Sequence, residues 1–420
     1  MSILNLKEAA ILWLAAFAVM MLLSLATQDF YSIRPPFVYD TVTRAVGPLV
    51  ACIALTFLAV NIRAKALSYV LFFAVSGTSL LGATQILTGF RVEPLHWWLY
   101  GLGFYTASLA YVHNNLLVNP ATPMVVSNPL LMFTGPIALY IKSSRHRRFS
   151  NRFRYYLPFL ILGLFLHQAV ATPLTPLLNL VEKTDVVSSL FFAVVFELFI
   201  YANFCGLSLV VFALAGLMGY AIPLNFRQPF SATHLVDFWK GWHVSLSLVL
   251  KSLFYVPLRQ AAGRTTALLG VYLASALWHG VAFNFLVWGL FHAVMYIATL
   301  WLLGRKKKFL PLIVFLITVV LGRLIFADPD MERLMVKASF QLVGDSHWAT
   351  LMNYPASVLI ALALGMVFIC TELLFQKKSL FRKRNYKFYR IPWVQVILLS
   401  ILALTVSTDA GTNYAVYGQR

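Results

Sequence analysis

The feature that most constrains this chain is a series of apolar runs, each long enough to cross a lipid bilayer. A hydrocarbon core about 30 Å thick needs about 20 apolar residues per helix. Of the 420 residues, 60% are hydrophobic and only 11% are charged, so the sequence predicts an all-α, polytopic membrane protein with about eleven transmembrane helices. The predicted spans lie near residues 9–27, 45–62, 66–85, 98–116, 156–176, 187–221, 265–281, 282–303, 309–327, 355–375 and 391–410.

Two stretches between these spans are predicted not to cross the membrane. Residues 117–141 are apolar but are broken by four prolines, which is typical of a re-entrant or interfacial segment that protein shields from lipid. We also treat residues 222–264 as non-crossing. The run 187–221 is too long for one perpendicular helix, so it is either strongly tilted or two short pieces. We expect the whole chain, 1–420, to form a single integral-membrane domain.

The distribution of charge predicts the orientation. Lys and Arg outnumber Asp and Glu by 33 to 14, an excess that could indicate a nucleic-acid or lipid partner. Basic residues also gather in the cytoplasmic loops of polytopic proteins, and the predicted spans put the clusters 63–65, 142–154, 305–308 and 377–390 on one side. We therefore expect a cytoplasmic N-terminus, a membrane-lipid surrounding and no nucleic-acid partner.

Two Trp-His pairs, Trp242-His243 and Trp278-His279, lie in these apolar surroundings. An imidazole is costly to bury in a membrane protein, so each histidine is a candidate functional residue. His279 follows an uncharged run, and Gly280 offers a place for the helix to break. Such a position fits a structural histidine, a reaction site or a proton path.

A helical reading of residues 237–253 predicts an amphipathic helix. The polar side chains that share one face are Lys240, His243, Ser247 and Lys251. Such a stripe belongs either to an ordinary interfacial helix or to the wall of a cavity. His292 is expected to be a packing or hydrogen-bonding group. Glu197 and Glu372 are expected to be pairing partners or to face a wet crevice.

Several runs near the histidines resemble the signature of the membrane-bound O-acyltransferase (MBOAT) family. They are Gly219–Phe230 (GYAIPLNFRQPF), Asp237–Ser247 (DFWKGWHVSLS), Leu277–Gly280 (LWHG), Asn284-Phe285 and Trp288-Gly289-Leu290. The similarity covers roughly residues 201–292 and is strongest to the bacterial branches of alginate O-acetylation and teichoic-acid D-alanylation. It implies a bacterial inner-membrane protein.

The resemblance also implies roles for individual residues. His279 is the expected catalytic residue, a general base that takes the proton of an alcohol, and His243 is the second catalytic candidate, which either polarises the thioester carbonyl or completes proton transfer. The expected substrate-binding or orienting residues are Trp242, Ser245, Asn203, Asp237 and Trp278. Asn203 stands where related proteins often have an acidic residue, so it keeps hydrogen-bonding capacity but carries no charge.

The implied reaction moves an acyl group from an acyl-coenzyme A or acyl-carrier-protein thioester to a hydroxyl of an envelope polysaccharide, a lipid or a secreted metabolite. No bound cofactor and no metal are expected. An acyl-carrier protein is an expected partner on the cytoplasmic face, as are acylation partners in the periplasm or envelope, and a central tunnel would join the two sides. The alternatives are a transporter or proton-coupled channel, and a non-catalytic member of an acylation complex.

Overall fold

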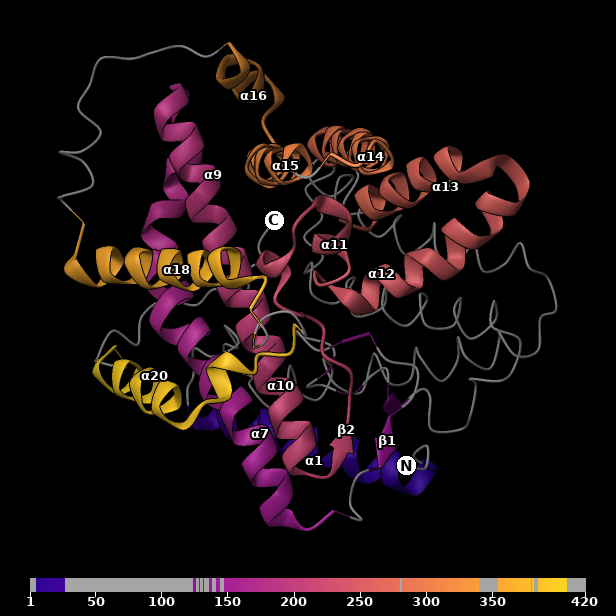
Figure 1. Ribbon diagram of the computed structural model, residues 1–420. Helices are drawn as coiled ribbons and strands as arrows, with labels where there is room; N and C mark the ends of the chain where they lie inside the picture. The colour runs from indigo at the N-terminus through magenta and orange to yellow at the C-terminus, as the bar shows by residue number, and fades with distance from the viewer. Residues whose placement is uncertain are drawn as a thin grey trace, which may run out of the picture.

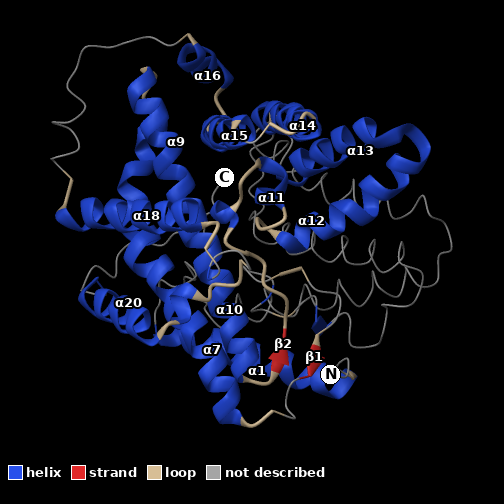
Figure 2. Cartoon of the chain, in the orientation of Figure 1, coloured by secondary structure: helices blue, strands red, loops and turns tan. Residues whose placement is uncertain are grey.

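The computed structural model describes residues 5–26, 124–125, 128, 131, 136–137, 141–143, 147–279, 282–307, 309–339, 354–378, 380 and 384–405. The predicted spans 45–62, 66–85 and 98–116, and most of the predicted re-entrant segment 117–141, lie outside these residues. The longer helices are α1 (Leu6–Ala26), α7 (Phe149–Leu164), α9 (Val186–Ile200), α10 (Gly206–Leu217), α13 (Val256–His279), α14 (Phe283–Gly304), α15 (Leu310–Ala327), α18 (Ala356–Phe375) and α20 (Pro392–Thr405). The shorter α-helices of the described residues are α8 (Thr172–Leu174), α11 (Leu235–Trp239), α12 (Val244–Leu250) and α16 (Met331–Ala338). Figure 2 shows how far helix dominates this part of the chain.

Five helical segments of the described chain are long and apolar enough to cross a membrane. They are Phe149–Glu182, Val186–Leu217, Phe283–Gly304, Leu310–Ala327 and Ala356–Phe375. Each overlaps a span predicted from the sequence, which confirms the helical, polytopic membrane architecture. The total of eleven crossings stays a prediction.

The long apolar run near 187–221 forms one continuous helical segment rather than two short pieces. A π-helical turn, Tyr201–Cys205, joins α9 to α10 without a break. The segment Phe149–Glu182 contains a second π-helical stretch, Phe165–Ala171, which packs against the first. The backbones approach closely here, since a Cβ on Gly163 would lie 2.7 Å from the carbonyl oxygen of Gly206. π-Helical turns of this kind are frequent at functional sites.

A short β-ladder adds the one extended pairing seen in the described residues. Strand β1 (Lys142–Ser143) pairs antiparallel with β2 (Tyr220–Ala221), with Lys142 opposite Ala221. The two strands lie side by side at one end of the molecule (Figure 1). This ladder, absent from the all-α prediction, ties the basic segment after residue 141 to the start of the run 219–230. Gly219, with φ 95°, makes the turn from α10 into β2.

Residues 244–279 form a helical hairpin, which differs from the single amphipathic helix predicted around 237–253. The first arm begins at Val244 and continues through a π-helical stretch, Lys251–Tyr255, into the start of α13. The chain reverses at Gly263 (φ 84°, ψ 179°), and the second arm returns to His279. Figure 1 shows α12 and α13 running out from the centre and back.

The hairpin is held by apolar packing between its arms. The residues that form this contact are Leu246, Val249, Leu250, Leu253, Phe254 and Ala274, with Leu258, Val271 and Trp278 around them. Gly270 allows the arms to approach, because a Cβ there would lie 2.3 Å from Cδ1 of Leu258. As a consequence, the start of the first arm and the end of the second lie at the same end of the hairpin.

The predicted polar stripe is wrong for a specific reason. Lys240 ends α11, and His243 takes φ 43°, in the left-handed region, directly before α12 begins. This backbone conformation interrupts helix, so Lys240 and His243 do not share a helical face with Ser247 and Lys251. The stripe assumed one uninterrupted helix across a position where the chain turns.

The other long helices pack on one another, and α14 connects them to the hairpin. α14 packs against both α13 and α15, and α15 packs against α9. α18 contacts α9 and the π-helical stretch Phe165–Ala171, and α20 contacts α7. α18 runs across α9 in Figure 1 rather than alongside it. The core therefore joins helices that are far apart in sequence around the segment 219–243.

Candidate active site

The ring of His243 is anchored chiefly by Asn225, with the hydroxyl of Ser245 3.5 Å from the same ring nitrogen. The amide oxygen Oδ1 of Asn225 lies 3.2 Å from Nδ1 of His243, accepts the hydroxyl of Ser245 at 2.8 Å and accepts the backbone N–H of Ser245 at 3.3 Å. Because a backbone N–H only donates, the atom facing it must be the amide oxygen. Nδ1 of His243 therefore carries the ring proton and donates a hydrogen bond to Oδ1 of Asn225. This leaves Nε2 of the neutral ring as a hydrogen-bond acceptor.

Backbone hydrogen bonds join the two ends of the segment 225–244, which carries His243. The N–H of Val244 donates to the carbonyl of Asn225 at 2.8 Å, and the N–H of Arg227 donates to the carbonyl of Gly241 at 2.8 Å. Position 241 has no room for a side chain, since a Cβ there would lie 2.8 Å from the Arg227 carbonyl oxygen. The two ends of the segment 225–244 are thus fixed to each other.

The basic segment 377–390 contributes to this closure. Arg384 donates from Nε to the carbonyls of Arg227 at 3.1 Å and Gln228 at 3.2 Å, and from Nη1 to the carbonyl of Asp237 at 2.7 Å. The N–H of Tyr386 donates to Oε1 of Gln228 at 2.7 Å. The clustering of charge alone would explain this segment as a signal for membrane orientation. In the structure, Arg384 also binds the segment 225–244 that carries His243.

His279 is the last residue of α13 that the structure describes, and aromatic rings surround it. Its ring centroid lies 4.9 Å from that of Phe326, 5.4 Å from that of Trp288 and 6.1 Å from that of Phe285. Asn284 donates from Nδ2 to the carbonyl of Phe326 at 3.0 Å and so fixes this wall. Trp288 and Phe326 thus bring α14 and α15 onto the end of α13.

The two histidines belong to one site. His279 lies within electrostatic range of His243, because the hairpin returns its second arm to the place where the first begins. The ring of Phe204, from the π-helical turn between α9 and α10, also packs against His243, with 4.9 Å between the centroids. The structure therefore places His243, Ser245 and His279 at the same end of the hairpin.

The other predicted residues are placed differently. The ring of Trp242 is buried against Phe238 and Tyr201, with centroids 5.4 and 5.8 Å apart. Asn203 makes a hydrogen bond through Oδ1 with Nδ1 of His167 at 3.0 Å rather than with either candidate catalytic histidine. Trp278 packs in the hairpin core.

Asp237 lies in a small polar group at the start of α11. Its carboxylate accepts a hydrogen bond from Nζ of Lys240 at 2.9 Å and lies 3.4 Å from Nε2 of His234. The N–H of Asp237 donates to Nδ1 of His234 at 3.2 Å, so Nε2 of that ring carries the proton. Burial lowers the pKa of His234, against the opposing effect of Asp237. Asp237 thus makes its side-chain contacts with residues at the two ends of α11. None of these contacts involves His243 or His279.

The three other buried polar residues singled out in the sequence are paired. Nδ1 of His292 donates to the carbonyl of Trp288 at 3.0 Å, Glu197 forms an ion pair with Arg323, and Glu372 accepts the hydroxyl of Tyr201 at 3.0 Å. These contacts agree with the expected packing and pairing roles.

The model of the MBOAT, membrane-bound O-acyltransferase family, matches residues 126–310. We call the matched residues 126–310, which are less than half of the chain, the MBOAT region. This finding confirms the resemblance seen in the motifs, and the MBOAT region includes both arms of the hairpin, His243 and His279.

Several relatives match part of this chain. The chain is 31% identical over 142 residues to a probable alginate O-acetylase of Pseudomonas aeruginosa, a match covering 32% of this chain and 27% of the relative. It is 32% identical over 101 residues to a peptidoglycan O-acetyltransferase of Helicobacter pylori, covering 23% and 19%. It is 31% identical over 125 residues to a teichoic acid D-alanyltransferase of Streptococcus thermophilus, covering 27% and 29%. Each match spans less than a third of the relative's length.

Sequence reasoning missed several residues of the site in this MBOAT region and beside it. Asn225 lay inside a quoted motif, but nothing in its spacing showed that it faces His243. Phe326 and Arg323 belong to α15, outside the motifs. An arginine within an apolar run is the signal that would have found Arg323, since intramembrane charges are rare and functional.

Proposed function

We propose that this chain is a membrane O-acyltransferase that moves an acyl group from a thioester donor to a hydroxyl. The observation that carries the proposal is the meeting of His243 and His279 at one end of a hairpin within the MBOAT region. A neutral imidazole with an unperturbed pKa near 6.5 is suited to taking a proton from an alcohol near neutral pH.

The proposed reaction begins when Nε2 of His279 removes the proton of the acceptor hydroxyl. The oxygen attacks the thioester carbonyl carbon, and the C–S bond breaks as the ester forms. The proton then passes to the leaving thiolate, so the histidine is regenerated. No acyl-enzyme is needed, because donor and acceptor react directly.

The hydrogen bonding of His243 favours one of its two expected roles. A ring that donates from Nδ1 to Asn225 presents an unprotonated Nε2, which accepts a proton but has none to offer a carbonyl. We therefore assign His243 to proton transfer rather than to polarising the thioester. Ser245, whose hydroxyl shares the Asn225 oxygen, orients this ring.

The names of the relatives support an envelope acceptor. They are described as acting in O-acetylation of alginate or peptidoglycan and in D-alanylation of teichoic acid. For this chain we propose an acetyl or aminoacyl group, carried by coenzyme A or by an acyl-carrier protein, and a hydroxyl on a polysaccharide, lipid or secreted metabolite. The proposed setting is the bacterial inner membrane, with the N-terminus and the basic segments on the cytoplasmic side, where the donor arrives.

Replacement of His279 tests the proposal. Membranes containing the wild type or His279→Ala would be given radiolabelled acetyl-coenzyme A, or a D-alanyl carrier-protein thioester, and base-labile label in envelope material would be counted. We expect His279→Ala to lower kcat by about 10²–10⁴-fold, the usual contribution of a general base. His234→Asn is the matched control, because asparagine keeps a side-chain oxygen for capping α11.

The outcomes separate the rival functions. Label incorporated equally by the wild type and His279→Ala would contradict a catalytic His279. Wild-type membranes that transfer no acyl group from either donor, yet show histidine-dependent proton or solute flux, would replace the enzyme by a transporter. Wild-type membranes that show neither activity would favour a non-catalytic partner.

A further inference from the structure

A buried ion pair joins α15 to α9. Arg323 of α15 donates from Nε to Oε2 of Glu197 of α9, and from Nη2 to Oε1 at 3.4 Å. The side chains are only 9% and 5% exposed. Taking both charges out of water costs several kcal/mol per ion, and a well-packed apolar pair of similar volume is often as stable. A role in stability is therefore a weak explanation for this pair.

The guanidinium of Arg323 also contacts the residue that precedes His243. Its Cζ lies 4.4 Å from the centroid of the Trp242 ring. A planar guanidinium stacks on an aromatic face while keeping its hydrogen bonds at the edge, an arrangement that the ammonium of lysine cannot reproduce. The face of the Arg323 guanidinium thus contacts the Trp242 ring, and its edge donates hydrogen bonds to Glu197.

The same turn of α15 contacts the surroundings of His279. Phe326, one turn along from Arg323, packs on His279, and Arg323 itself lies within electrostatic range of that ring. Gly322 lies against His292, since a Cβ there would be 2.2 Å from Cε1 of the imidazole. One helical turn therefore faces the elements that carry both candidate catalytic histidines.

We propose that Arg323, held in place by Glu197, is a positioning residue of this site that fixes Trp242 beside His243 and supplies a fixed positive charge near His279. The inference rests on the proposed acyl transfer. As the hydroxyl attacks, the thioester carbonyl oxygen gains negative charge. A charge that is already oriented stabilises this state more than the ground state and needs no reorganisation.

The test is a double substitution that removes both charges together. Glu197→Gln with Arg323→Gln leaves two amides that can hydrogen-bond to each other, and so avoids an unpaired buried charge. We expect kcat for transfer from acetyl-coenzyme A, or from the D-alanyl carrier-protein thioester, to fall by about 10²-fold, with the donor KM changed by less than about three-fold. Arg323→Lys keeps the charge but not the planar fork, and should recover about a tenth of wild-type kcat.

A second ionic cluster provides the control. Asp328→Asn with Arg333→Gln and Lys337→Gln removes both partners of Asp328 together with its charge, so none of the three charges is left unpaired by the others. The contacts of this cluster do not reach either histidine, and kcat should stay within about two-fold of the wild type. Thermal unfolding in detergent would verify that both multiple variants are folded.

Wild type and His279→Ala would be measured alongside, so that the two proposals can fail separately. If the wild type transfers nothing, the proposed function is wrong. If the wild type is active, His279→Ala is not, and the Glu197→Gln, Arg323→Gln variant has wild-type kcat, then the function stands and the role of Arg323 is overturned. A large rise in KM without loss of kcat would also overturn it. If the double variant does not fold, the Arg323→Lys variant decides. Wild-type kcat and KM in that variant would exclude a role of the planar guanidinium in holding Trp242.

Discussion

At the residue scale, Asn225 determines how His243 can act. One amide oxygen holds the ring nitrogen, the Ser245 hydroxyl and the Ser245 backbone, so a single side chain sets the tautomer and the orientation of the imidazole. Within the described part of the chain, the amide nitrogen of Asn225 has no hydrogen-bond partner. Its oxygen is therefore the atom that matters.

Substitution of Asn225 tests this assignment. Asn225→Leu removes the hydrogen-bond acceptor of the His243 ring, and we expect kcat to fall by about 10²-fold because the ring is no longer held in one orientation. The variant also leaves buried hydrogen-bond donors unpaired, which should lower the free energy of unfolding by about 1–3 kcal/mol. Asn225→Asp keeps every contact of the oxygen and should retain more activity than Asn225→Leu. Steady-state kinetics and thermal unfolding in detergent would measure both, and equal kcat for the two variants would contradict the assignment.

At the scale of elements, the hairpin creates the site by reversing at Gly263. The pair φ 84°, ψ 179° is a conformation that essentially only glycine adopts. From the sequence, two amphipathic or apolar stretches could be recognised. The reversal was missed because one glycine between helix-forming residues is also compatible with a continuous helix.

Replacement of Gly263 isolates this backbone requirement. A Cβ at position 263 would meet nothing within 4 Å, so Gly263→Ala adds backbone strain without a clash. We expect it to cost about 1–3 kcal/mol of unfolding free energy and to lower activity as the arms shift. Gly304→Ala is the control, since its Cβ also meets nothing within 4 Å and its φ is not positive. Equal melting temperatures for the two variants would refute the strain at Gly263.

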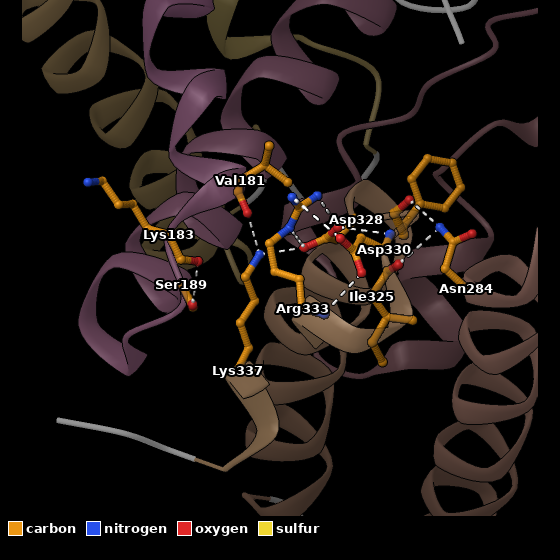
Figure 3. A network of polar contacts seen from close by, with 10 residues as sticks. Val181, Lys183, Ser189, Asn284, Ile325, Asp328, Asp330, Arg333 and Lys337 are labelled. Atoms are coloured by element: carbon orange, nitrogen blue, oxygen red, sulfur yellow. Dashed lines mark hydrogen bonds and ion pairs between the residues drawn. The ribbon is translucent and has the colours of Figure 1, made fainter. Parts of the chain in front are cut away.

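At the scale of the whole molecule, distant segments are fastened by polar contacts that a sequence does not reveal. Figure 3 shows such a network where α15 leads into α16: Asp328 accepts hydrogen bonds from Arg333 and Lys337, and Lys337 also donates to the carbonyl of Val181. The contact joins α16 to the end of the helical segment Phe149–Glu182. Burial raises the pKa of Asp328, but these hydrogen bonds outweigh it and the pKa is lowered.

This network predicts a pH-dependent stability. The pKa of Lys337 is lowered because burial outweighs its contact with Asp328, so the favourable partner of Asp328 is chiefly Arg333, whose pKa is raised. Because the folded pKa of Asp328 lies below the ordinary value of about 3.9, its contribution is complete above that value and is lost as pH falls through the folded pKa.

Asp328→Asn should remove this contribution. We expect about 3–5 kcal/mol of destabilisation at neutral pH, since a buried cation loses its partner, and a smaller loss of stability on acidification than in the wild type. Asp330→Asn is the control, because Asp330 is half-exposed and 3.8 Å from Arg333, and such a pair contributes about 0–1 kcal/mol. Unfolding curves of the wild type and both variants would be measured between pH 3 and 7. If the stability of Asp328→Asn changed with pH in parallel with that of the wild type, the role of the network would be contradicted.

The sequence predicts the membrane class, most described helices and the two histidines, because hydrophobic periodicity and motif spacing are local properties. Asn225, Phe326 and the pair of Arg323 with Glu197 are brought together by tertiary packing, and no local pattern encodes which distant side chain a residue will meet. The interruption before α12 was missed for a related reason, since His243 adopts a left-handed backbone that tertiary contacts maintain.

The hairpin also has a consequence for how the site forms. His243 and His279 meet through contacts local to one supersecondary unit, and contacts of low sequence separation form early and fast during folding. Glu197 and Arg323 are 126 residues apart, so their pairing must await most of the chain. A ribosome-bound chain ending soon after α14 would therefore already hold both histidines at the same end of the hairpin. Arg323 of α15 would be added next, and Arg384, which binds the segment that carries His243, would be added last.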